Sequence, residues 1–89
     1  MKVYIVMKED NLPSETTTEV LEVLDSFEKA KTYLEVNYHE LLKECENGTF
    51  IPGYFSEYTA EISDKYWEIR SKIDESIYMS DSIEEFEVK

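Results

Sequence analysis

The side chains best suited to catalysis or metal binding are few and lie far apart in this sequence. His39 is the single histidine and Cys45 the single cysteine, six residues further along the chain. Residues with this separation lie on different faces of a helix, so the two side chains cannot act as base and nucleophile or share a metal ion. We expect His39 to be an ordinary surface residue and Cys45 to belong to the core.

Carboxylates are abundant, but their spacing does not indicate a catalytic pair. The tightest clusters are Asp74-Glu75 and Glu84-Glu85. Neighbouring residues of a strand point to opposite faces, and a catalytic pair needs two environments that separate the pKa values of its carboxyls. Gly48 and Gly53 are isolated, so a phosphate-binding loop is not expected, and the Asp/Asn ladder of an EF-hand is missing. We therefore expect no enzyme activity, no metal and no cofactor.

The net charge is the strongest global signal in the sequence. Asp and Glu number 21 against nine Lys and Arg, which gives a formal net charge of −12 at pH 7. Nucleic acids and anionic membrane surfaces attract Lys and Arg, so we expect neither as a direct partner. A protein with a basic surface is attracted instead, including a nucleic-acid-binding protein. The simpler interpretation, that the charge only keeps the chain in solution, stays open.

Acids are densest near the C-terminal end of the chain. Between positions 74 and 87 there are six acids and no Lys or Arg: Asp74, Glu75, Asp81, Glu84, Glu85 and Glu87. Asp81, Glu85 and Glu87 are expected on one outward face of a last strand. Alternate strand residues repeat every ~6.6 Å, close to twice the ~3.4 Å between phosphates along a DNA strand. We expect these acids to contact a basic partner.

An aromatic segment offers a second candidate for partner binding. Residues 50–58 include Phe50, Tyr54, Phe55 and Tyr58. Aromatic side chains beside acids are typical of protein-binding hot spots. We expect Phe50 and Phe55 to be buried, and Tyr54 and Tyr58 to be accessible to a partner. Alternatively, these rings only close the open side of a small core.

Alternating apolar side chains predict the strands that must position these residues. Strands are expected at residues 2–8, 19–24 and 65–73, and residues 76–79 and 83–88 supply one further strand or two. Trp67, Ile69 and Ile73 should share one face of their strand, and Phe86 and Val88 should point inward. Residues 9–18 are polar and contain a proline, which predicts a loop. Residues 49–60 are expected to be irregular, with Pro52-Gly53 in a type II turn.

One helix is expected between the second and third strands. Apolar side chains recur there at helical spacing: Phe27, Ala30, Leu34, Tyr38, Leu41 and Cys45. Asp25 and Ser26 are both suitable N-caps, and Asp25 with Glu28 has capping-box spacing. Asn47-Gly48 suits a left-handed C-terminal end. The helix would be about 32 Å long, enough to cover one face of a small sheet.

These elements predict a single α+β domain over residues 1–89. It would be a small antiparallel sheet of four to five strands with one long amphipathic helix packed on one face. The apolar content of 42% and aromatic content of 13% suffice for one core. The single cysteine allows no internal disulfide, and the first apolar stretch is too short for a signal peptide or membrane span. We therefore expect a cytoplasmic protein.

Three segments carry a family resemblance: residues 2–6 (Lys-Val-Tyr-Ile-Val), 23–34, which contain Ser-x-x-Lys-Ala, and 83–88 (Ile-Glu-Glu-Phe-Glu-Val). They are similar to the first strand, helix start and last acidic strand of a group of short uncharacterised proteins from phages and prophages of Gram-positive bacteria. Residues 38–72 have no counterpart in that group. The resemblance implies a phage accessory protein acting in the host cytoplasm, and such proteins often bind and inhibit a host protein.

Two functions from different classes are compatible with this sequence. The first is a small acidic accessory protein that binds and inhibits or modulates a host protein, including as a nucleic-acid mimic at a basic site in an anti-defence role. The second is a non-catalytic structural or self-assembling domain, in which a homodimer covers leftover apolar faces and acidity serves only solubility. A complex that weakens with salt favours the first, and a salt-insensitive dimer favours the second.

Overall fold

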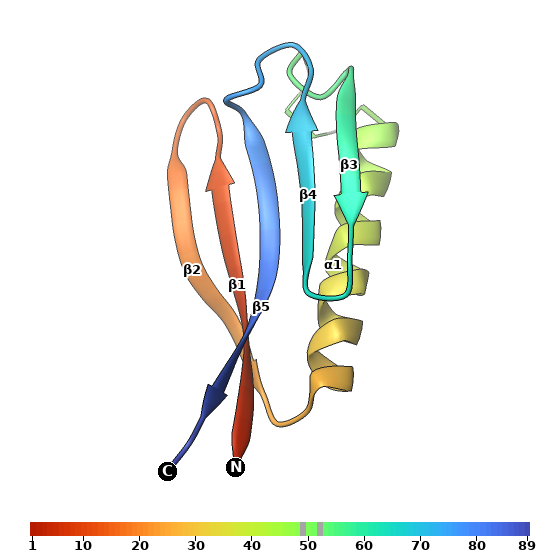
Figure 1. Cartoon of the computed structure of the whole chain (residues 1–89). Helices are drawn as coiled ribbons and strands as arrows, with labels where there is room; N and C mark the ends of the chain where they lie inside the picture. The colour runs from red at the N-terminus through yellow and green to blue at the C-terminus, as the bar shows by residue number, and fades with distance from the viewer. Residues whose placement is uncertain (49, 52) are drawn as a thin grey trace.

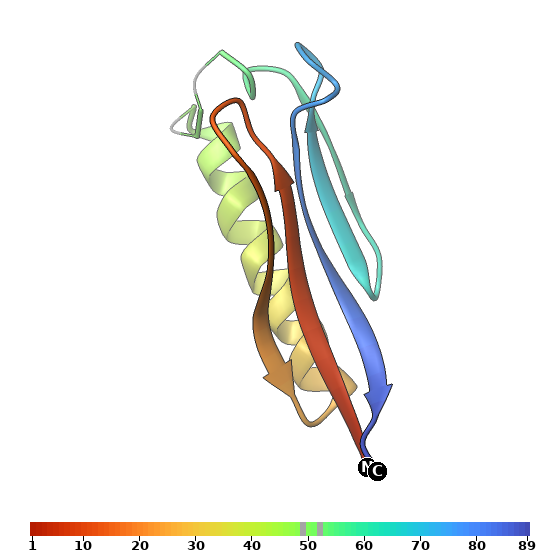
Figure 2. The same cartoon turned by 90° about the vertical axis from the view of Figure 1, so that its left-hand side faces the viewer.

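A computed structural model describes residues 1–48, 50–51 and 53–89. Within these residues the elements are β1 (Lys2–Asn11), β2 (Thr16–Leu24), α1 (Phe27–Glu46), β3 (Tyr58–Ile62), β4 (Tyr66–Ser71) and β5 (Tyr78–Glu87). The strands form one antiparallel sheet in the order β2-β1-β5-β4-β3, and α1 lies along one side of it (Figures 1 and 2). The expected α+β class, with an antiparallel sheet and a helix, is confirmed. No helix in the described part of the chain is long and apolar enough to cross a membrane.

β1 and β2 form a longer hairpin than the polar residues between them predict. Their pairing continues to Asn11 and Thr16. The connection is a tight turn in which Leu12 N–H donates to Glu15 C=O at 2.8 Å and Glu15 N–H to Leu12 C=O at 3.3 Å. Pro13 occupies the second position of this turn, which its fixed φ favours. The loop expected at residues 9–18 is therefore wrong in extent, because most of these residues belong to the two strands.

Residues next to both ends of α1 cap the helix. Ser26 is the N-cap, and its Oγ accepts a hydrogen bond from Lys29 N–H at 3.2 Å. The Asp25 carboxylate binds Lys29 Nζ at 2.8 Å instead of serving as the cap, so the capping-box prediction is wrong. At the other end Gly48 adopts a φ of +69°, and its N–H donates to Cys45 C=O at 3.1 Å. Glycine tolerates this left-handed conformation without a Cβ clash.

The core lies between α1 and the sheet. The helix buries four of the side chains predicted from its spacing: Ala30, Leu34, Tyr38 and Cys45. They pack in one cluster with sheet residues that include Val6, Trp67 and Ile69. The rings of Tyr38 and Trp67 are 5.8 Å apart. Ile73 was expected beside Trp67 and Ile69, but it is 55% exposed because β4 ends at Ser71.

The register divides the strand side chains between two faces. Directly paired residues of antiparallel strands point to the same side. On one side, Val6 is paired with Ile83 and Lys8 with Asp81, and this side packs against α1. On the other side, Val3, Ile5 and Met7 lie opposite Phe86, Glu84 and Ser82. No element in the described part of the chain covers this second side (Figure 2), which we call the open face.

The second half of the sheet departs from expectation at residues 49–60 and confirms one of the two alternatives for the last strand. Residues 49–60 were expected to be irregular, but Tyr58–Ile62 forms the edge strand β3, which pairs with β4. Residues 76–79 and 83–88 contribute to a single strand, β5, because the polar residues 80–82 stay paired with β1. The type II turn expected at Pro52-Gly53 stays a prediction, because Pro52 lies outside the described residues.

Candidate partner-binding surface

One half of the open face is mostly apolar, with Glu84 opposite Ile5, and lies toward the end of the sheet that carries both termini (Figure 1). Its apolar side chains are Val3, Ile5, Met7, Val20, Val23 and Phe86. Three of these side chains, Val20, Val23 and Phe86, are 54%, 51% and 47% exposed. Single exposed apolar residues are normal on a protein surface, whereas a contiguous group is typical of an interaction site.

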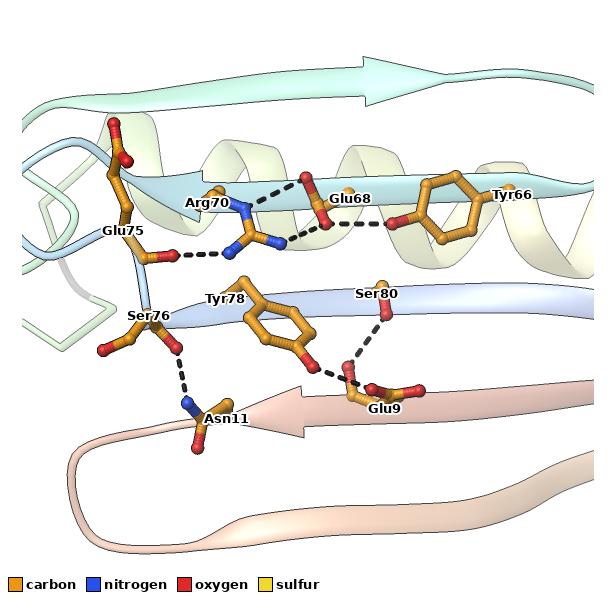
Figure 3. Close-up of polar contacts among 9 residues, drawn as sticks. All are labelled: Glu9, Asn11, Tyr66, Glu68, Arg70, Glu75, Ser76, Tyr78 and Ser80. Carbon is orange, nitrogen blue, oxygen red and sulfur yellow. Dashed lines mark hydrogen bonds and ion pairs between the residues drawn. The ribbon is translucent and has the colours of Figure 1, made fainter.

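The other half of the open face carries an ordered polar network centred on Arg70 (Figure 3). The guanidinium binds Glu68 twice, through Nη2 at 2.7 Å and Nε at 3.3 Å. Its Nη1 donates to Glu75 C=O at 2.5 Å, and the group lies 4.5 Å from the centre of the Tyr78 ring. Tyr66 OH also donates to Glu68, at 2.9 Å. All three guanidinium nitrogens are therefore engaged within this chain.

Tyr78 and Ser80 extend the polar network from β5 to β1. Tyr78 OH donates to Glu9 Oε1 at 2.7 Å, and Ser80 Oγ donates to Glu9 C=O at 2.9 Å (Figure 3). At the end of the strands, Asn11 Nδ2 donates to Ser76 C=O at 2.5 Å. The network thus joins β4, β5 and β1. It fixes these side chains in place and leaves them little freedom to lose on binding a partner.

The open face as a whole is negatively charged. Glu9, Glu61, Glu68 and Glu84 point to this side, and Arg70 is the one base on it among the described strand residues. The hydrogen bond from Arg70 holds the pKa of Glu68 below its usual value, and Glu68 raises the pKa of Arg70 in return. Both groups stay charged near neutral pH and neutralise each other. The remaining carboxylates therefore set the sign of the potential at this surface.

The acids expected to act together are dispersed over β5 and the connection that precedes it. Asp74 and Glu75 lie in the connection between β4 and β5, whereas residues 84–87 lie at the far end of β5. Within that end, Glu84 points to the open face, and Glu85 and Glu87 point to the opposite side. Only Glu84 of these acids therefore lies on the strand surface of the open face.

Glu85 and Glu87 have cationic neighbours within the chain. Glu85 Oε1 lies 3.6 Å from Lys2 Nζ, and Glu87 Oε1 lies 3.2 Å from the amino group of Met1. These pairs are exposed, so each contributes little to stability. They reduce the negative potential on this side of the strand.

Asp81 lies in the interior and not on the surface. Its side chain is 3% exposed beneath α1, where Asn37 Nδ2 donates to Asp81 Oδ2 at 3.3 Å. Asp81 does share a face with Glu85 and Glu87, but α1 covers the Asp81 end of that face. The prediction of an outward row of three acids is therefore wrong. For the same reason Phe86 and Val88, expected inward, are 47% and 45% exposed.

The aromatic segment lies against the core. Phe55 is 2% exposed, as expected, and Phe50 is partly buried at a ring distance of 5.5 Å from it. Tyr54 and Tyr58 are also partly buried and pack against the core cluster. Ser71 Oγ donates to Tyr54 C=O and ties this segment to β4. A role for the two tyrosines in partner binding stays a prediction.

His39 and Cys45 occupy separate environments. His39 is exposed, and Cys45 is 4% exposed. Burial, with smaller effects from Glu44 and Glu46, raises the pKa of the Cys45 thiol to about 11. A thiol protonated at neutral pH is a poor nucleophile. Among the described residues, no three His, Cys, Asp or Glu side chains lie together as a metal site.

The sequence-based interpretation expected leftover apolar faces, but it did not name the residues of the apolar half of the open face as a site. The signal was present in residues 3–7, whose side chains are apolar on both faces of the strand. One helix covers one face of a sheet, so the second apolar face had to stay uncovered or meet a partner. The Arg70 network gave no comparable signal, because Tyr78 and Glu9 are 69 positions apart.

Comparison with protein-family models, curated proteins and solved structures gives no match to this chain. The resemblance to short phage proteins therefore stays a prediction. A function has to be inferred from the charge, exposure and geometry of the open face.

Proposed function

We propose that this protein is a binding module that docks its open face on a basic surface of another protein and so inhibits or modulates that protein. The observation that carries the proposal is the pairing of an exposed apolar half with a negatively charged half whose arginine is neutralised internally. Protein interfaces combine an apolar centre with complementary charge that steers the encounter. A cytoplasmic setting fits the buried free thiol of Cys45.

The partner needs an apolar patch beside Lys or Arg side chains. The apolar patch would cover Val20, Val23 and Phe86, each about half exposed, and burying the exposed part contributes about 1 kcal/mol per side chain. Basic side chains would face Glu9 and Glu84. Nucleic-acid-binding proteins carry basic surfaces of this kind, so they are the first class of partner to test.

Self-association is the second candidate, because the same apolar half could be covered by another copy. Two copies docked in this way would bring two sets of open-face carboxylates together, and each chain carries a net charge of −12. Salt screens that repulsion, so a homodimer formed through the open face should tighten as salt rises and not be salt-insensitive, as the sequence alone suggested. A complex with a basic partner should weaken under the same change. Sedimentation at low and high salt separates the two functions.

Two valines provide a matched test of the docking surface. Val20 lies on the open face and is 54% exposed, and Val36 lies on α1 and is 48% exposed. Immobilised wild-type protein and the variants Val20→Lys and Val36→Lys would be compared for capture of basic proteins from a cell extract at low salt. We expect Val20→Lys to lose the captured protein and Val36→Lys to keep it, with melting temperatures close to that of the wild type.

The controls decide between surface-specific docking and general charge attraction. Both substitutions add the same positive charge, so an equal loss of capture by both variants would show that only net charge matters. Equal retention by both would show that the open face is not the binding surface. Either result contradicts the proposal.

A further inference from the structure

A cavity of about 370 Å³ lies between α1 and the sheet, on the opposite side from the open face. Its volume falls within the range of small-ligand pockets in proteins. Tyr33, Leu41 and Trp67 contribute to its apolar wall, and Lys8, Asp10 and Asp81 contribute to its polar wall. The docking surface proposed above uses none of these side chains.

Asp81 lies in the wall of this cavity without an ion-pair partner among the described residues. It is 3% exposed, and its hydrogen bond from Asn37 is 3.3 Å long. Lys8 also lines the cavity, but its ammonium group binds Asp10 at 3.2 Å and lies 3.8 Å from Glu19. A buried carboxylate normally has a cation or several donors, because burial without them costs several kcal/mol. Asp81 has neither.

Trp67 contributes a second incompletely satisfied group to the same wall. Its Nε1 is buried and has no hydrogen-bond partner in the described part of the chain. The indole lies close enough to Asp81 to favour the charged form of that carboxyl. Buried polar groups nearly always have a partner, so each exception needs an explanation. A cation has no acceptor for this N–H, so a cationic ligand would pair with the Asp81 carboxylate and leave the indole N–H directed at the same carboxylate.

We propose that this cavity binds a small organic cation, an ammonium or guanidinium group on a short apolar stem, whose charged end pairs with Asp81. The described lining residues include four carboxylates, on Asp10, Glu40, Glu44 and Asp81, against the single ammonium group of Lys8. The apolar wall can hold the stem, and the ring of Trp67 can contact the cation. This site lies on the other side of the sheet from the docking surface, so it does not depend on the proposed function.

Protonation of Asp81 should control the site. Burial raises the pKa of Asp81 to about 6. The groups around it are Lys8 and Asp10 from β1, Asn37 from α1 and Trp67 from β4, and Glu40 and Glu44 of α1 complete the charged lining. Above this pKa the carboxylate is charged and attracts a cation. Below it the carboxyl is neutral, so cation affinity should fall as pH decreases through this range.

The test uses Trp67 as its reporter. The chain has one tryptophan, so a ¹H–¹⁵N spectrum has one indole resonance. The whole protein would be titrated near neutral pH in about 0.15 M salt, which screens diffuse attraction. The probes are n-butylguanidinium, N-acetylarginine amide and neutral n-butanol. We expect saturable shifts of the indole resonance with a roughly millimolar dissociation constant for the cations, and none for n-butanol.

The two cationic probes separate the sources of the cation. A response to n-butylguanidinium alone supports a free small molecule as the ligand. A response to both probes supports a site that also accepts an arginine side chain from another protein. An indole resonance that does not respond to either cation, or responds equally to n-butanol, would overturn the proposal.

Variants test the role of Asp81. Asp81→Asn removes the charge with little change in shape, and we expect it to weaken n-butylguanidinium binding by roughly tenfold or more. Glu85→Gln removes the same charge from the same strand outside this cavity, and binding should be unchanged. In the wild-type protein, lowering the pH below the pKa of Asp81 should also weaken n-butylguanidinium binding. Wild-type affinity in Asp81→Asn, or in the wild-type protein below that pKa, would contradict the proposed site.

Discussion

Asp81 and the groups around it make the fold sensitive to pH at the scale of a single residue. Burial raises the pKa of Asp81 from 3.8 to about 6, so the folded chain binds this proton more tightly than the unfolded chain does. Stability then falls as pH rises between the unfolded and the folded pKa, because in this range the unfolded state has released the proton that the folded state still holds. The buried carboxylate is therefore tolerated at neutral pH at a cost in stability.

Replacing Asp81 by asparagine should remove that cost. We expect Asp81→Asn to raise the free energy of unfolding by about 1–2 kcal/mol at about pH 7.5 and to change it little at about pH 3, where the wild-type carboxyl is also neutral. The asparagine side chain keeps the shape and can still bind Asn37. Urea unfolding of both proteins at the two pH values measures the difference. An equal loss of stability at both pH values would show that the charge of Asp81 does not matter.

Cys45 should be chemically inert in the folded protein. The thiol is 4% exposed, and burial raises its pKa to about 11, so little thiolate is present or accessible at neutral pH. We expect modification by a thiol reagent to be slow and to accelerate in step with unfolding as urea is added. Fast modification in native buffer would show that α1 opens locally near its C-terminal end.

At the scale of helices and strands, spacing in the sequence predicted which side chains share a face but not which face is covered. Asp81, Glu85 and Glu87 do share one side of β5, as the alternation indicated. A strand with apolar residues on both sides, such as β1, gives no local signal for the side on which the helix packs. Asp81 and Phe86 were therefore placed on the wrong surfaces, although the strand containing them was recognised.

Partners distant in the sequence explain the other errors at this scale. Glu9 and Asn11 read as loop residues because they are polar, but their partners Tyr78 and Ser76 lie 69 and 65 positions away. The helix was predicted more accurately because its spacing and its caps are local features. Ser26 and Gly48 act within one turn of the helix ends.

The N-cap of α1 gives a direct test of this local control. Ser26 Oγ accepts a hydrogen bond from Lys29 N–H at 3.2 Å. We expect Ser26→Ala to lower the free energy of unfolding by about 1 kcal/mol, and Ser26→Asp to preserve most of it, because aspartate caps helices as well as serine does. Chemical unfolding of the three proteins measures both effects. Similar losses in the two variants would point to packing at this position and not to capping.

At the scale of the whole molecule, shape and charge together favour docking through the sheet. The molecule is elongated, with extents of 46 × 21 × 17 Å, and α1 occupies one side of the sheet (Figure 2). The open face is therefore a broad surface that can meet a partner without any rearrangement of the helix. A net charge of −12 attracts basic proteins and repels nucleic acid over roughly a Debye length, about 8 Å at physiological salt.

Glu84 and Glu85 allow the most direct measurement of docking through the open face. They are adjacent on β5 and both exposed, and their side chains point to opposite sides of the sheet. The dissociation constant of the captured basic partner would be measured for Glu84→Lys and Glu85→Lys at low and high salt. We expect Glu84→Lys to weaken binding by roughly tenfold or more at low salt, less at high salt, and Glu85→Lys to change it by less than about twofold. Equal effects of the two substitutions, or a loss with Glu85→Lys alone, would contradict binding through the open face.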